Sequence, residues 1–252
     1  MKMNGNSELQ VAIILPTYCE AENVANIIHA IEELELRSLI LVIDDSSPDG
    51  TQEKVKQLQQ EYENIVLLTR PFKMGLGTAI TDGFRHLLSR GGETAEYIIT
   101  MDADNSHNPY EIPKLFSMAQ RGYDVVVGSR YCKEGKVEGW KLSRLIISKA
   151  ANKIVRKLIK LPINDFTSGF RCYSRKYITM ALPKLHSQTY EIQIETLRQA
   201  KIQNSRVAEI PITFQNRKRG KSKLTLTEIT AFLKYILKVI HEQLRANTAA
   251  SA

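Results

Sequence analysis

The sequence lacks a long hydrophobic run. Its longest stretch without Lys, Arg, Asp or Glu is the eleven residues 9–19, whereas a membrane-spanning helix needs about 20 apolar residues. The N-terminal segment also lacks the basic-then-apolar pattern of a secretory signal peptide. We therefore expect no membrane span and a location on the cytosolic side.

Cysteine is scarce as well. The 252 residues include three cysteines, Cys19, Cys132 and Cys172, which share no metal-ligand spacing. An odd, sparse count suits a reducing compartment better than a disulfide framework. With 43% hydrophobic and 25% charged residues, the composition excludes disordered, collagen-like and coiled-coil proteins.

The net charge of +8 is divided unevenly along the chain. Residues 1–126 carry 10 Lys and Arg against 19 Asp and Glu, a net −9, and residues 127–252 carry 25 against 8, a net +17. The second half is therefore expected to meet something anionic, such as phosphates, nucleic acid or a membrane surface.

Short apolar runs alternate with segments of helical period, which is the pattern of βαβ units. We expect strands at 11–15, 39–44, 65–69, 97–101 and 125–129, and helices at 22–36, 51–60, 77–89 and 112–120. Strands this apolar are buried on both faces, so the fold class is α/β with a doubly wound, mainly parallel sheet. We expect one domain over 1–252, with a disordered tail at 246–252.

Polar motifs follow these strands, where α/β sheets bind ligands. Asp102 and Asp104 follow the fourth strand, and their oxygens favour Mg²⁺ or Mn²⁺. The alternative is that Asp102 forms a turn or caps a helix.

Asp44, after the second strand, belongs to a turn that opens a helix, and an acidic residue there also suits a ribose or base. The turn at 73–79 lacks phosphate-loop spacing, although its amides could face a ligand.

The second half contains two basic amphipathic segments, 142–160 and 228–245. Such helices lie either in a membrane interface or against the protein core with a solvated basic face, and the sequence leaves both open. Arg144 and Ser148 share one helix face, and residues 217–223 form a second basic cluster. Two such clusters could bind two phosphate groups, although a single arginine is more often a solvated surface charge.

Taken together, the motifs resemble the dolichyl-phosphate mannosyltransferases, inverting family 2 glycosyltransferases with the GT-A fold. The resemblance covers roughly residues 9–240. Its motifs are P-T-Y-x-E-A-E-N at 16–23, D-D-S-S-P-D-G-T at 44–51, G-L-G-T-A at 75–79, D-A-D-x-S-H-x-P at 102–109, G-S-R-Y at 128–131, G-W-x-x-x-R-x-x-x-S-x-x-A-N at 139–152, T-S-G-F-R at 167–171 and F-x-x-R-x-x-G-x-S-K-L at 214–224.

The resemblance implies a nucleotide-sugar-binding half at 9–130 and an acceptor- and membrane-facing half at 131–245. The nucleoside would be held by Pro16, Tyr18, Glu20, Val42 and Asp44. Asp102, Ala103 and Asp104 would hold the sugar diphosphate, and Asp104 and Ser106 the metal. The diphosphate and the incoming phosphate would be bound by Arg130, Arg217 and Lys223, with Arg144 and Ser148 on the acceptor side. Asp102, Asp104, Arg130 and Arg217 are the expected catalytic residues.

The implied reaction moves mannose from GDP-mannose to a dolichyl or polyprenyl phosphate with inversion. Membrane attachment would be peripheral or supplied by a small anchoring subunit, because no spanning tail follows Arg245. The alternatives are a family 2 transferase with UDP-glucose, another donor or a soluble acceptor, a scaffold subunit with an inactive site, and a basic nucleic-acid-binding protein. The chain lacks the aromatic platform and motifs of that last class, so we expect no nucleic-acid partner. One departure from the family is Cys19, where Asn is common.

Overall fold

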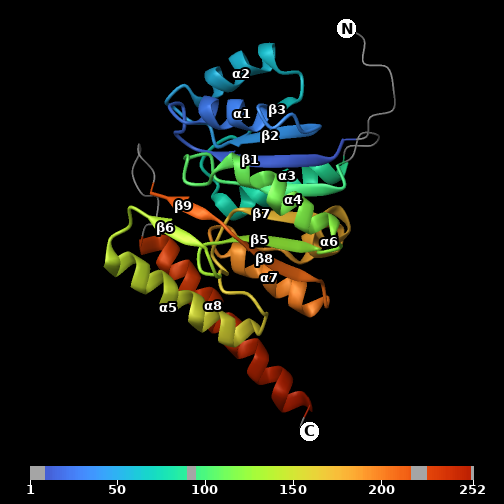
Figure 1. Cartoon of the computed structure of the whole chain (residues 1–252). Helices are drawn as coiled ribbons and strands as arrows, with labels where there is room; N and C mark the ends of the chain where they lie inside the picture. The colour runs from blue at the N-terminus through green and yellow to red at the C-terminus, as the bar shows by residue number, and fades with distance from the viewer. Residues whose placement is uncertain (1–8, 90–94, 217–225, 251–252) are drawn as a thin grey trace.

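The computed structural model describes residues 9–89, 95–216 and 226–250. Its centre is a seven-stranded sheet in the order β3-β2-β1-β4-β7-β5-β8 (Figure 1). The strands are β1 (Val11–Thr17), β2 (Ser38–Asp44), β3 (Ile65–Thr69), β4 (Tyr97–Thr100), β5 (Val125–Ser129), β7 (Arg171–Ser174) and β8 (Val207–Pro211). A parallel pair, β6 (Lys136–Glu138) and β9 (Thr213–Gln215), forms a second sheet beside it.

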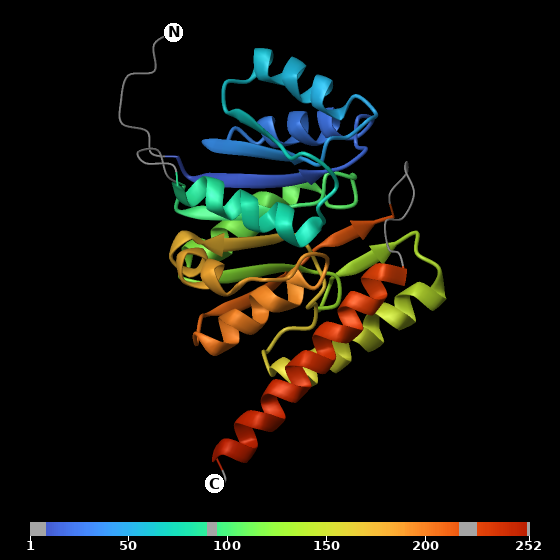
Figure 2. The same ribbon diagram turned by 180° about the vertical axis from the view of Figure 1, so that it is seen from behind.

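Helices cover both faces of the large sheet (Figures 1 and 2). One face packs on α1 (Val24–Glu32), α2 (Thr51–Glu61) and α4 (Ile112–Gln120), and the other on α3 (Leu76–Ser89), α6 (Arg175–Ala181) and α7 (Ile192–Ile202). Alternate residues of β1 point into the two cores, with Ile13 in one and Ile14 in the other. Burial on both faces explains why the strands are continuous apolar runs.

The five expected strands and four expected helices of the first 130 residues are all present. The first helix is shorter than expected because it ends at Glu32, and Glu35 adopts a left-handed φ of 52°. The tail expected to be disordered at 246–252 is helical as far as Ala250, since α8 (Leu226–Ala250) continues through it. Residues 246–250 include three alanines and no Gly or Pro, so nothing in them interrupts a helix.

Strand β7 is the main difference from the expected sheet. It runs antiparallel between β4 and β5, with Arg171 paired to Thr100 and to Val127. The start of β7 therefore lies at the carboxyl end of β4, directly before Asp102. This pairing brings the segment 165–170 to the edge where the first half of the chain collects its polar motifs.

The amphipathic helix α5 (Leu142–Ile159) lies beside α8, below the sheet in the view of Figure 1. Val155 and Ile159 are its buried apolar residues. Four others are exposed, namely Leu142, Ile146, Ile147 and Ile154. Of the two alternatives that the sequence left open for this segment, Ile146 and Ile154 do not follow the core-packed one, because the helix turns these residues outward. No described helix is long and apolar enough to cross a membrane.

The first turn of α3 contacts the segment 186–190 closely. The amides of Gly77 and Thr78 donate to the carbonyl of Gln188 at 2.9 and 3.3 Å. A Cβ on Gly77 would stand 2.3 Å from the carbonyl oxygen of Ser187. These amides hold a neighbouring loop, which explains the glycines here without a bound phosphate.

Substituting Gly77→Ala should lower the free energy of unfolding by about 1–3 kcal/mol, because the methyl group meets backbone that a rotamer change cannot move aside. Urea unfolding followed by circular dichroism measures the change. An unfolding free energy equal to that of the wild type would contradict the close packing.

Candidate active site

The carboxyl ends of β1 and β2 form the first part of the site. Thr17 pairs in register with Asp44, and the hydroxyl of Thr17 donates to Oδ2 of Asp44 at 2.9 Å. The buried carboxylate of Asp44 also accepts hydrogen bonds from Ser47 N, Ser47 Oγ and Gln52 Nε2. Asp44 therefore holds the turn that opens α2, as the turn interpretation of this motif predicted. Its contact with a nucleoside stays a prediction.

The other expected nucleoside residues lie around the same edge. Pro16 and Tyr18 are partly exposed, and Nζ of Lys73 lies 4.5 Å from the centre of the Tyr18 ring. Glu20 is 5% exposed and accepts a hydrogen bond from Asn23 Nδ2. Val42 is fully buried in the core, so only its backbone is available to a ligand.

A tight turn after β4 carries the proposed metal ligands. Asn105 adopts a left-handed φ of 60°, which Asn tolerates better than most residues. The turn lets Oδ1 of Asp104 accept a hydrogen bond from the amide of Ser106 at 3.0 Å. Asp104 and Ser106 are 5% and 2% exposed, and Ser106 Oγ is buried without a hydrogen-bond partner among the described residues.

These oxygens fit a hard divalent cation. A buried hydroxyl without a partner is costly, and a carboxylate next to a hydroxyl is a donor set that suits Mg²⁺ or Mn²⁺. No group of three or more His, Cys, Asp or Glu side chains converges on a metal position within the described residues. That is compatible with Mg²⁺, which typically takes one or two protein carboxylates and completes its shell with water and substrate phosphates.

The side chain of His107 packs under the Asp102–Ser106 turn, between that turn and Phe170. Its Nδ1 accepts a hydrogen bond from the amide of Asp102 at 3.2 Å, and its ring stacks on Phe170. Burial lowers the pKa of His107 and outweighs the opposing effect of the Asp102 carboxylate. The imidazole is thus a neutral acceptor that helps to orient the Asp102–Asp104 loop.

Arg130 forms a buried ion pair at the end of β5. Its Nε and Nη2 contact the two carboxylate oxygens of Asp165 at 2.7 and 2.8 Å, with exposed side-chain fractions of 7% and 0%. Burial raises the pKa of Asp165, but the Arg130 guanidinium and several amide donors lower it more, so it lies below its ordinary value. Nη1 makes no hydrogen bond within the described residues, so it is the nitrogen of Arg130 left for an anion.

Aromatic rings connect Arg130 to the acceptor-side residues. The guanidinium carbon lies 5.2 Å from the centre of the Tyr131 ring and 5.6 Å from that of Trp140. Arg144 lies 3.9 Å above the same Trp140 ring, and Ser148 Oγ accepts a hydrogen bond from the Tyr131 hydroxyl at 2.7 Å. The structure therefore brings Arg130, Arg144 and Ser148 together. Arg217 and Lys223 lie outside the described residues.

Sequence reasoning missed several residues that build this site. Asp165 precedes the T-S-G-F-R segment, and no role was assigned to it from the sequence. Arg171, in the same segment, is fully buried and donates to the carbonyls of Phe166, Ser168 and Gln193. A charged residue in a run without apolar periodicity gives no sequence signal of such burial.

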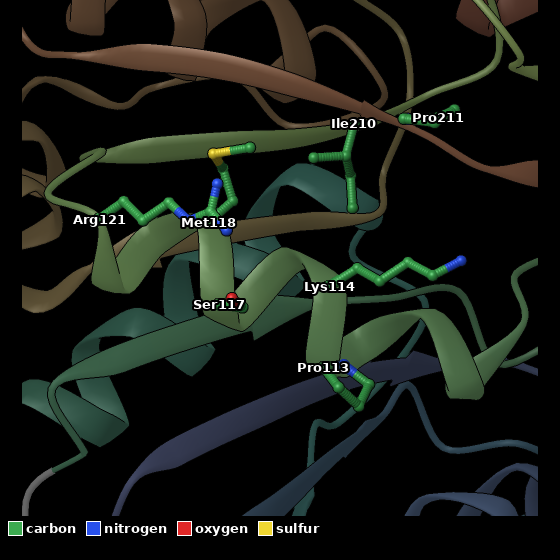
Figure 3. Close-up of a pocket in the computed structure, with 7 residues that line it drawn as sticks. All are labelled: Pro113, Lys114, Ser117, Met118, Arg121, Ile210 and Pro211. Atoms are coloured by element: carbon green, nitrogen blue, oxygen red, sulfur yellow. The ribbon is translucent and has the colours of Figure 1, made fainter.

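A surface groove of about 410 Å³ lies elsewhere, between α4 and the end of β8 (Figure 3). Lys114, Met118 and Ile210 contribute to its lining. It includes none of the predicted site residues, so the carboxyl edge of the sheet remains the candidate site.

Substituting Asp165→Asn should destabilise the fold by about 3–5 kcal/mol, because it leaves a buried guanidinium without its counter-charge. Glu242→Gln is the matched control, since its pair with Arg198 is 21% and 40% exposed and should contribute about 1 kcal/mol or less. Urea unfolding of both variants gives the comparison. Equal losses of unfolding free energy in the two variants would contradict a buried ion pair between Arg130 and Asp165.

Comparisons with known proteins agree with this geometry. Residues 12–179 match the model of Glycosyl transferase family 2. The polyprenol monophosphomannose synthase of Mycolicibacterium smegmatis is 36% identical over 86% of this chain and 82% of its own length. The undecaprenyl-phosphate mannosyltransferase of Micrococcus luteus is 36% identical over 86% of this chain and 88% of its own length. The dolichol-phosphate mannosyltransferase of Pyrococcus furiosus is 35% identical over 92% of this chain and 64% of its own length.

Solved structures share the fold at low identity. Glucosyl-3-phosphoglycerate synthase from Mycobacterium tuberculosis superposes with a TM-score of 0.66 at 16% identity, covering 91% of this chain and 78% of the other. A mannosyltransferase from Pyrobaculum calidifontis, solved with GDP-Man and Mn²⁺, superposes with a TM-score of 0.56 at 16% identity, covering 98% of this chain and 77% of the other. The mainly parallel sheet carries the D-A-D turn at its polar edge, the family model matches more than half of the chain, and the relatives exceed one-third identity. The chain therefore belongs to glycosyltransferase family 2 and is a glycosyltransferase.

Proposed function

We propose that the protein transfers mannose from GDP-mannose to a polyprenyl or dolichyl phosphate, with inversion at the anomeric carbon and with Mg²⁺ or Mn²⁺. The observation that carries the proposal is the Asp104–Ser106 turn, with its buried unpartnered hydroxyl at the end of β4. The names of the relatives support the lipid-phosphate acceptor and the sugar. The GDP-Man and Mn²⁺ in the Pyrobaculum calidifontis structure support the donor and the metal.

The acceptor removes the need for a catalytic base. A phosphomonoester carries a charge of about −1.5 to −2 at neutral pH, so its oxygen is already a nucleophile. The task of the protein is then to align two anions that repel each other and to stabilise the leaving diphosphate. A divalent cation held by Asp104 and Ser106 would supply charge neutralisation at that diphosphate.

The remaining site residues act on the two anions and the nucleoside. Arg130 offers Nη1 to the diphosphate while Asp165 fixes its orientation. Arg144 and Ser148, one helical turn apart at the start of α5, bind the acceptor phosphate, and Arg217 and Lys223 complete the anion site. Pro16, Tyr18, Glu20 and the backbone at Val42 surround the nucleoside.

A donor-by-acceptor assay tests this assignment against its main alternatives. The purified protein is incubated with GDP-mannose or UDP-glucose, with a short polyprenyl phosphate or a soluble sugar acceptor, and with Mn²⁺ or EDTA. We expect product only from GDP-mannose, the lipid phosphate and metal together. Glucosyl transfer from UDP-glucose, or transfer to the soluble acceptor, would replace the proposal with the corresponding alternative.

Substituting Asp104→Ala should reduce metal-dependent mannosyl transfer by about 100-fold or more, because the variant loses the carboxylate that anchors the cation. Ser106→Ala should raise the Mn²⁺ concentration for half-maximal activity about 10-fold and keep most of the maximal rate. Initial rates across a Mn²⁺ titration measure both effects. Full activity of the Asp104 variant would rule out the metal assignment.

We further propose that the protein binds the cytosolic face of the membrane through α5 and α8. Exposed apolar side chains on α5 include Ile147 at 69% and Ile154 at 51%, and Leu233 and Leu237 are exposed on α8. Exposed lysines alternate with them on α5, at Lys149, Lys153 and Lys157. The first turns of the same helix carry Arg144 and Ser148, so a bilayer on this face would present its lipid phosphates next to them. A small anchoring subunit stays a prediction.

The double substitution Ile147→Asp with Ile154→Asp should weaken binding to phosphatidylglycerol vesicles about 100-fold, because two apolar side chains leave the interface and two negative charges enter it. Ile202→Asp is the control, since Ile202 is 54% exposed at the end of α7. Vesicle co-sedimentation measures binding, and high salt should release the wild type. Equal binding of both variants to the vesicles would contradict the proposal that α5 and α8 form the membrane-binding face.

A further inference from the structure

Gln193, the second residue of α7, is 2% exposed. Its side-chain nitrogen lies close to Gly169, as does the carboxylate of Asp102 at the polar edge of the sheet. Gln193 belongs to none of the sequence motifs interpreted above.

A glycine opens the space in front of this amide. A Cβ placed on Gly169 would stand 3.4 Å from Nε2 of Gln193 and 3.2 Å from Oδ1 of Asp102. The amide nitrogen and the carboxylate oxygen therefore face the same space above the Cα of Gly169. Glycine leaves that space open, and any other residue would place its side chain there.

The backbone on both sides of the space is fixed. Nη1 of Arg171 donates to the carbonyl of Gln193 at 2.5 Å, and the amide of Gln193 donates to the carbonyl of Tyr190 at 3.1 Å. On the opposite side, the hydroxyl of Thr100 donates to the carbonyl of Gly169 at 2.8 Å. Because Arg171 is fully buried, the backbone from which the Gln193 side chain projects is held in place before any substrate arrives.

We propose that Gln193 and Asp102 together bind one hydroxyl group of the transferred sugar over Gly169. A hydroxyl donates one hydrogen bond and accepts another, which matches a carboxylate acceptor on one side and an amide donor on the other. A phosphate oxygen would be repelled by the Asp102 carboxylate, and a polyprenyl chain offers no polar group. This inference rests on the proposed function for the identity of the donor, and it adds Gln193 and Gly169 to the sugar subsite.

The test compares a nucleotide sugar with the same nucleotide without the sugar. Gln193→Leu keeps a side chain of similar size and removes the amide. We expect its Kd for GDP-mannose to rise about 10-fold and its kcat/KM to fall about 10- to 100-fold, with its Kd for GDP unchanged. Calorimetric titration gives the two Kd values, and the unchanged GDP affinity shows that the variant is folded.

Gln199→Leu is the matched control. Gln199 lies on the same helix and is 7% exposed, and its side-chain oxygen has no hydrogen-bond partner among the described residues. It lies about 9 Å further along the helix axis than Gln193. Its Kd for GDP-mannose should equal that of the wild type. Gly169→Ala, whose methyl group enters the shared space, should weaken GDP-mannose binding as Gln193→Leu does.

Deoxymannose donors identify the contact directly. For the GDP-deoxymannose that lacks the bound hydroxyl, wild type and Gln193→Leu should show equal kcat/KM. The inference is overturned if Gln193→Leu binds GDP-mannose as tightly as the wild type, or if no deoxy donor removes the difference. If the wild type binds UDP-glucose and not GDP-mannose, the proposed donor is wrong, and a loss specific to UDP-glucose in Gln193→Leu would still support the subsite.

Discussion

The antiparallel pairing of β7 between β4 and β5 determines how the two halves of the chain meet. Because β7 runs against its neighbours, the segment before it lies at the carboxyl end of β4. That segment supplies Asp165, which fixes Arg130, and Gly169, which lies against Asp102. A parallel strand in this position would have placed both residues at the opposite edge, away from the Asp102–Ser106 turn.

Charge in this part of the molecule is buried and satisfied locally. Asp165 accepts hydrogen bonds from Arg130 and from the amides of Thr167 and Ser168. Arg171 has no carboxylate partner within the described residues and donates to neutral oxygens instead. Such hydrogen bonds are stronger at low dielectric, so they make the framework rigid around the site that we propose to align two anions. In the proposed function, the uneven charge of the chain corresponds to acidic metal and nucleoside ligands in one half and anion-binding arginines in the other.

The sequence predicted the first half well because its apolar runs end at polar motifs, and in parallel sheets those motifs share one edge. It did not predict β7, since the four residues Arg-Cys-Tyr-Ser carry no alternating pattern. Gln193 lies in a helix without a distinctive motif, and its role depends on a glycine 24 residues earlier. The periodicity of α5 indicated an apolar face but not its direction, because periodicity is defined relative to the helix axis and not to the rest of the protein.

The central claim is that the carboxyl edge of the sheet binds a sugar nucleotide through a divalent cation held at Asp104 and Ser106. Its most direct test is a calorimetric titration of GDP-mannose into the purified protein, once with Mn²⁺ and once with EDTA. We predict a Kd about 10-fold or more lower with Mn²⁺, since the cation neutralises the diphosphate next to Asp102 and Asp104. Equal affinity in the two titrations, or no binding in either, would contradict the account.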